Sequence, residues 1–213
     1  MQDAIVGSWA QESHLSVESL GSLHDLNHRF LDLAAARAHG RAPGGAGFSP
    51  ILAGQLAPLS QAQRRAAAGC PYALFDLRFQ DDGHWRSRLQ EPRAWCVAEE
   101  AVPDGGAVID DETLSFVGLA LFYAWHVAAG AGLAAQLQLG MKGSTAAAFR
   151  RISVNRLPAL AATEAAHLSA RWIECSAFWS ALTAAAARAN PPGLRRVQLY
   201  GLQLAAASRL PHH

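Results

Sequence analysis

Apolar residues recur at three- and four-residue intervals along most of the chain, which is the period of an amphipathic helix. Between residues 22 and 38, Leu23, Leu26, Phe30 and Leu33 fall on one helical face. Valine, isoleucine and threonine are sparse, and alanine, which favours helix, is abundant. The pattern therefore predicts an all-α protein, with further helices over residues 49–59, 60–69, 113–132, 144–152, 153–168, 177–190 and 194–210.

Residues typical of helix starts and helix ends support several of these boundaries. Ser49 with Pro50 is typical of a helix start, and Ser60 with Gly69 predicts an N-cap and a stop for the next helix. Pro158 falls early enough in its helix for the first turns to accommodate it. Residues 72–79 fit a short strand or an extended arm.

The chain also resembles itself when it is shifted by 93 residues. The shift places Arg78 on Arg171, each beside an aromatic residue, where the two arginines could serve as structural anchors. It also aligns, without a gap, Leu26 with Leu119, Phe30 with Tyr123, Gly47 with Gly140, Leu56 with Phe149, Ser60 with Ser153, Phe79 with Trp172, and Trp85 with Phe178. We therefore expect a tandem repeat of two similar helical units with short extended arms, made of unit one (1–90), a linker rich in Pro, Gly and acids (91–112), and unit two with C-terminal helices (113–213).

Unit one resembles the FlhD-type flagellar transcriptional regulators. The residues that carry the resemblance are Asp25, Asn27, Phe30, Leu31, Leu33, Ala34, Gly47, Leu59, Ser60, Gln63, Arg78 and Phe79, and unit two repeats it at Leu139, Gly140, Ile152, Ser153, Leu160, Ala161, Arg171 and Trp172. The resemblance implies a helical regulator that self-associates and acts with a partner subunit at promoters. Family members carry one unit and dimerise, so two units imply an internal pseudo-dimer.

Two departures from that family limit what carries over. The family places a cysteine three residues before the arginine of its Phe-Arg-Phe end, which Arg78 and Arg171 match here. Phe75 and Leu168 stand at the cysteine's place, so no intersubunit disulfide is expected there. The zinc-binding cysteines of the family's partner subunit have no counterpart in this chain.

Charge is distributed unevenly between the two halves. Residues 1–112 hold nine arginines and fifteen acidic residues, a net charge of −6, whereas residues 113–213 hold nine basic and two acidic residues, a net charge of +7. A basic half indicates an anionic partner, although solvated faces give the same asymmetry. The predicted nucleic-acid or partner-binding residues are Lys142, Arg150, Arg151, Arg156, Arg195 and Arg196.

Motifs for catalysis or metal binding are not evident. Lys142 precedes Gly143 and so lacks the Gly-Lys-Ser/Thr order of a phosphate loop; Ser144 or Thr145 is instead expected to cap a helix. His24 and His28 have the i, i+4 spacing of a metal pair but no obvious third ligand, so they are interpreted as surface histidines. His126 is expected to be a buried, hydrogen-bonded histidine. The sequence thus predicts no enzyme, no metal and no cofactor.

Cysteine usage and hydropathy favour a cytoplasmic protein. The chain has an odd number of cysteines, and no two of them have the spacing of metal ligands: Cys70, Cys96 and Cys175. An odd number argues against a disulfide framework. No signal peptide is expected at the N-terminus. Residues 113–141 carry no Asp, Glu, Lys or Arg, but their many Ala, Gly and Gln residues favour a buried pair of helices over a membrane span.

These patterns predict a non-enzymatic transcriptional regulator or co-regulator. It would act through a protein partner subunit, with direct DNA contact and homo-oligomerisation left open, and without a membrane. The alternative is a protein-only adaptor in a secretion or signalling assembly, and an enzyme with an unrecognised site comes third.

Overall fold

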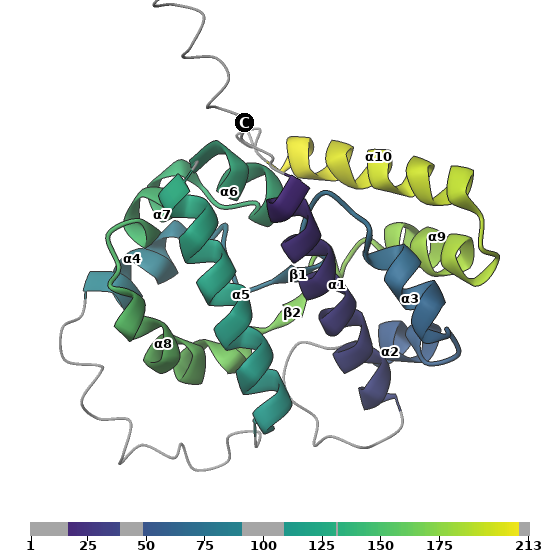
Figure 1. Ribbon diagram of the computed structural model, residues 1–213, viewed down its shortest axis with the longest axis horizontal. Coiled ribbons are helices and arrows are strands. Elements are labelled where there is room, and N and C mark those ends of the chain that lie inside the picture. The colour runs from purple at the N-terminus through teal and green to yellow at the C-terminus, as the bar shows by residue number, and fades with distance from the viewer. Residues whose placement is uncertain (1–16, 39–48, 91–108, 131, 209–213) are drawn as a thin grey trace, which may run out of the picture.

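The computed structural model describes residues 17–38, 49–90, 109–130 and 132–208, and helices make up most of these ranges (Figure 1). The all-α prediction is therefore confirmed for the part of the chain that is described. In chain order the helices are α1 (Val17–Arg37), α2 (Pro50–Leu56), α3 (Gln61–Ala68), α4 (Asp82–Gln90), α5 (Asp111–Gly130), α6 (Gly132–Leu139), α7 (Gly143–Phe149), α8 (Leu157–Glu164), α9 (Ser176–Ala187) and α10 (Pro191–Ala207).

Two long helices, α1 and α5, pack against each other at the centre of the molecule (Figure 1). The helices α2 and α3 cover α1, and the helices α6, α7 and α8 cover α5. Three aromatic rings meet where these layers join: Phe116 of α5 lies 6.0 Å from Phe30 of α1 and 5.1 Å from Phe75, measured between ring centroids. Burial of these large apolar side chains joins the two layers in one core.

Two short strands cross the middle of the fold. Strand β1 (Phe75–Asp76) pairs antiparallel with β2 (Ser169–Ala170), so Phe75 lies opposite Ala170. Of the two alternatives for residues 72–79, a short strand or an extended arm, the short strand is present, and it pairs with a segment far away in the sequence. After each strand the chain turns through a left-handed residue, Arg78 (φ 56°) or Trp172 (φ 51°), and enters α4 or α9.

The two predicted anchor arginines follow these strands. Arg78 donates to the Asp81 carboxylate at 2.9 Å, and both side chains are partly exposed. Arg171 is buried, donates to the Gln138 carbonyl at 3.0 Å, and lies 4.5 Å from the centre of the Trp172 ring. Arg78 is therefore paired with a carboxylate, and Arg171 is stacked on an aromatic ring.

Asn27 fixes the loop after α3 onto α1. Its side chain is fully buried, and its amide donates to the carbonyls of Ala68 at 3.1 Å and Tyr72 at 2.9 Å. Its carbonyl accepts from the Leu74 backbone N–H at 2.8 Å. A single buried side chain thus satisfies several loop groups that would otherwise be costly to bury.

Helix boundaries confirm some expectations and correct others. Ser60 forms a capping box with Gln63 at the start of α3, and Gly69 follows the end of that helix, as predicted. The assignment of Ser144 or Thr145 as an N-cap is wrong, because α7 begins at Gly143 with Lys142 at the N-cap position. The predicted helix over residues 153–168 is divided into a 3₁₀ turn (Val154–Arg156), α8 with Pro158 in its first turn, and a second 3₁₀ turn (Ala165–His167).

Within the described ranges, one helix, α5, has the length and mean hydropathy of a membrane span. Half of its most apolar window is buried inside the structure, mainly against α1, α6, α7 and α8. That burial is expected of a core helix in a soluble protein. Its outer face nevertheless exposes Leu119 and Phe122, at 41% and 50% of their full area.

Candidate functional site

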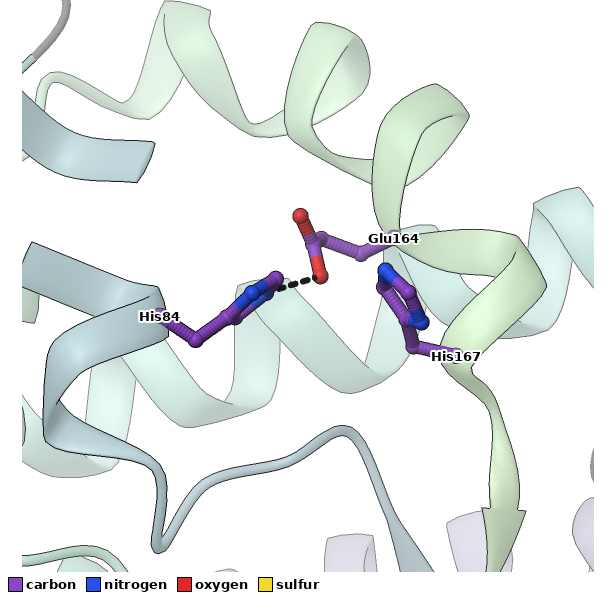
Figure 2. Close-up of side chains that lie close together, drawn as sticks. All are labelled: His84, Glu164 and His167. Carbon is purple, nitrogen blue, oxygen red and sulfur yellow. Dashed lines mark hydrogen bonds and ion pairs between the residues drawn. The ribbon is translucent and has the colours of Figure 1, made fainter. Parts of the chain in front are cut away.

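The side chains of His84, Glu164 and His167 come together between α4 and the end of α8 (Figure 2). His84 lies in the first turn of α4, Glu164 is the last residue of α8, and His167 ends the following 3₁₀ turn. Each offers one atom that could bind a metal ion, and these three atoms lie within 4.8 Å of one another. We call this group the His–Glu–His cluster.

Local packing aims His84 at α8. The Asp81 carboxylate accepts from the His84 backbone N–H at 2.9 Å, which caps the start of α4. The neighbouring Trp85 is fully buried, with its ring 4.8 Å from that of Phe149 and its indole N–H donating to the Arg78 carbonyl at 3.1 Å. Trp85 fixes the rotation of α4 about its axis, and the His84 ring, which lies edge to face with the Trp85 ring at 5.5 Å between centroids, reaches Glu164 with its Nε2.

Glu164 carries its carboxylate into the protein interior. Its side chain is fully buried, and its Oε2 lies 2.7 Å from His84 Nε2 while its Oε1 lies 3.2 Å from Arg88 Nε. A buried carboxylate requires such partners, because an uncompensated buried charge is strongly destabilising. Both partners come from α4, so Glu164 ties this helix to α8.

His167 completes the cluster from the other side of the carboxylate. Its ring is half-buried and meets the His84 ring edge to face, with centroids 5.3 Å apart. Burial lowers the pKa of His167, and the nearby Glu164 charge partly opposes that effect. Two imidazoles and a carboxylate are donors that suit zinc and related divalent metals, and the same groups can also serve as an ion-paired brace.

Sequence reasoning did not find this cluster, because His84 and Glu164 are 80 residues apart. The sequence does contain one sign of the cluster, the Glu-x-x-His spacing of Glu164 and His167. Two residues three apart lie next to each other on one face of a helix, so both side chains could bind the same ion. Among the residues that the structure describes, His24 and His28 do not belong to a group of three donors that could hold a metal ion. His24 is half-buried, and His28 is buried with its Nε2 3.6 Å from Asp32, so the interpretation of His28 as a surface histidine is wrong.

His126 differs from its prediction as well. It is exposed on α5, where it lines a groove against α1, rather than buried and hydrogen-bonded. Its neighbour Trp125 is the residue whose ring N–H turns inward, donating to the Ile152 carbonyl at 3.0 Å.

The predicted basic residues fall into two separate groups. Lys142, Arg150 and Arg151 are exposed at the two ends of α7, and Arg156 is half-buried in the 3₁₀ turn that follows. Arg195 and Arg196 are exposed on α10, which packs against α9 and lies on the other side of the molecule from α7 in Figure 1. Their assignment to nucleic-acid or partner binding stays a prediction.

An open groove of about 300 Å³ lies along the contact between α4 and α7. Arg86 of α4 and Arg151 after α7 line it, together with Ser144, Thr145 and Asp82. The Asp82 carboxylate pairs with two other residues that line the groove. Arg86 Nη2 lies 2.6 Å from its Oδ2, and the Thr145 hydroxyl donates to its Oδ1 at 3.3 Å. A hydrogen bond from Ser144, with contributions from Arg86, Thr145 and Lys142, lowers the pKa of Asp82.

No family model, no curated protein and no solved structure matches this chain. The resemblance to FlhD-type regulators therefore rests on the residues given above.

Proposed function

We propose that the protein is a non-enzymatic transcriptional regulator that contacts nucleic-acid phosphates with the groove between α4 and α7. The observation that carries the proposal is the convergence of Arg86 and Arg151 on one groove, and Lys142 and Arg150 are exposed at the two ends of α7, the helix that forms one wall of it. Guanidinium groups suit this task, because their planar N–H donors bind phosphate oxygens bidentately. Phosphate contacts of this kind give affinity without sequence readout, which fits a subunit that works beside a partner.

We also propose that the chain forms an internal pseudo-dimer of the FlhD type. The order α1, α2, α3, β1, α4 recurs as α5, α7, α8, β2, α9, and four of these five elements begin 93 or 94 residues later in the second half. The strands β1 and β2 pair antiparallel, as a local twofold requires. Moreover, α4 packs on α7 of the second half, while α9 packs on α2 and α3 of the first. The last of the five elements in each half thus packs on the other half, which supports two intertwined units.

A gel-shift titration with double-stranded DNA tests the DNA function. Replacement of Arg150 and Arg151 by alanine should weaken binding and reduce the slope of log affinity against log salt by about 1.8, since each phosphate contact contributes about 0.9. The Arg195→Ala/Arg196→Ala pair, the second group of predicted binding residues, is the matched comparison, because it removes the same charge from exposed positions on α10 and should weaken binding less if the groove holds the DNA. Equal losses from both pairs would show that net charge, rather than this groove, binds DNA.

The groove between α1 and α5 favours the second candidate function, a protein-only adaptor. This groove has a volume of about 350 Å³ and is lined by Leu26, Leu119, Phe122, Tyr123 and His126. An exposed apolar groove of this kind suits the apolar face of a partner helix. A partner recovered by pull-down with the wild type but not with Phe122→Ser, in a protein that shifts no DNA at low salt, would establish the adaptor.

A further inference from the structure

We propose that His84, Glu164 and His167 bind one Zn²⁺ ion, which joins α4 to the end of α8. The donors are two imidazole nitrogens and one carboxylate oxygen, a set that proteins use for tetrahedral zinc with a water molecule as fourth ligand. This site goes beyond the proposed DNA function and does not depend on it.

The geometry needs only small changes to accept the ion. Zinc ligands lie about 2.0–2.2 Å from the metal, so donor atoms of a tetrahedral site are roughly 3.3 Å apart. The three donor atoms now lie within 4.8 Å of one another, and His84 Nε2 and Glu164 Oε2 are already 2.7 Å apart. Side-chain rotations that open this pair slightly and draw His167 inward would complete the site, with no movement of the helices.

Placement of the ligands in the fold supports the site. Figure 2 shows His84 and His167 on opposite sides of the Glu164 carboxylate. The two oxygens of the carboxylate have different neighbours: Oε2 faces His84 and could bind the ion, while Oε1 lies 3.2 Å from Arg88 Nε. Arg88 would then hold the ligand carboxylate in place from the outer shell, as hydrogen-bonding groups around metal sites commonly do.

Burial distinguishes this cluster from an ordinary surface trio. Glu164 is fully buried and His84 is 10% exposed, so a bound ion would lie largely out of water and be strongly attracted by the carboxylate. His167 is half-buried, which leaves a path for the ion and room for the water ligand. The cluster brings together donors from both halves of the chain, so the ion would stabilise the folded state by linkage.

Binding is tested on the full chain after removal of metal with a chelator. Equilibrium dialysis against Zn²⁺ should find a tight site with one ion per chain, and Co²⁺ in its place should give the visible absorption of tetrahedral coordination. At a hundredfold excess of Zn²⁺ over its Kd, the Tm should rise by about 5–10 °C. His84→Ala and His167→Ala should each weaken binding by at least about a hundredfold and remove the Tm shift, since even outer-shell changes cost 10–100-fold.

Controls separate this site from adventitious binding by the other histidines. His126→Ala removes an exposed histidine outside the cluster and should leave affinity, Co²⁺ spectrum and Tm shift unchanged. His167→Ala is the decisive variant, because its half-buried ring can be removed with little loss of packing, and circular dichroism verifies its fold. The absence of a tight site in the wild type, or a site that survives His167→Ala at unchanged affinity, would overturn the proposal.

Discussion

The helices α1 and α5 have nearly the same length, 21 and 20 residues, and pack side by side, but different interactions hold them. On α1, Asp32 pairs with Arg64 at 2.6 Å, Arg37 pairs with Asp110 at 3.0 Å, and Asn27 makes buried hydrogen bonds to a loop. After Glu112, α5 has no Asp, Glu, Lys or Arg. Its buried positions are almost all apolar.

This difference shows two ways of placing a central helix. Apolar burial is strong but non-directional, so the rotation of α5 about its axis depends on a few hydrogen bonds, from the Trp125 ring N–H to the Ile152 carbonyl at 3.0 Å and from the Tyr123 hydroxyl to the Gln138 side-chain carbonyl at 2.7 Å. Hydrogen bonds from a buried amide are directional, and they satisfy the loop after α3 in one register only. We therefore expect α1 to set the specificity of the core and α5 to supply much of its apolar contact.

The largest effect is expected where α1 makes its directional bonds. Asn27→Ala would leave the Leu74 N–H and the Ala68 and Tyr72 carbonyls buried without this partner, which costs about 3 kcal/mol or more. The Tm should fall by about 6–12 °C in a thermal melt monitored by circular dichroism. Asn155→Ala, at an exposed position, is the control and should stay within about 0.5 kcal/mol of the wild type.

A smaller loss is expected where the two helices meet through Asp110. Its carboxylate accepts from the Thr113 backbone N–H at 2.7 Å, which caps α5, and it also pairs with Arg37 of α1. Asp110→Ala should cost about 2 kcal/mol in a urea melt, from the lost helix cap and the lost ion pair with Arg37. Asp110→Asn keeps a capping oxygen and should cost about half as much. Equal losses would show that the ion pair alone matters.

The smallest effect, and one of opposite sign, is expected at glycines inside the two helices. No side chain or backbone outside the helix lies within 4 Å of where a Cβ would stand at Gly21 of α1, and at Gly118 of α5 it would meet only the Ala161 methyl at 3.9 Å. Gly21→Ala and Gly118→Ala should each stabilise the protein by about 0.5–1 kcal/mol, measured by urea denaturation. Gly118→Ala should gain more, because it adds a packed methyl.

Gly201→Ala in α10 is the contrast for these two changes. A methyl there would collide with the Tyr72 hydroxyl, so this variant should lose stability despite the better helix propensity. A gain from Gly201→Ala would show that α10 is not packed against Tyr72 in solution.

Sequence patterns predicted the elements whose signals are local. The Leu23–Leu26–Phe30–Leu33 spacing identified the buried face of α1, and all four residues are buried. The Ser60 cap was also correct, because a capping box needs only residues within one turn.

Elements stabilised by distant residues were not predictable in this way. The helix α4 is short and polar, and it is anchored by Trp85, whose ring packs against Phe79 and Phe149. One of the three residues of the His–Glu–His cluster, His84, lies on this unpredicted helix, whereas Glu164 ends α8 and His167 ends the 3₁₀ turn that follows. The basic residues were easy to select from the sequence, but their separation between α7 and α10 depends on how these helices pack. The DNA-binding role and the family resemblance stay predictions.

The pairing of β1 with β2 has a consequence for how the chain is made. Phe75 leaves the ribosome well before its partner Ala170 is synthesised, and α4 must likewise wait for α7. During that interval Phe75, Trp85 and the apolar face of α1 lack the partners that cover them in the finished protein. Until the second half is translated, the nascent first half should therefore depend on chaperones that hold exposed apolar segments, and a stall near residue 110 should favour its degradation.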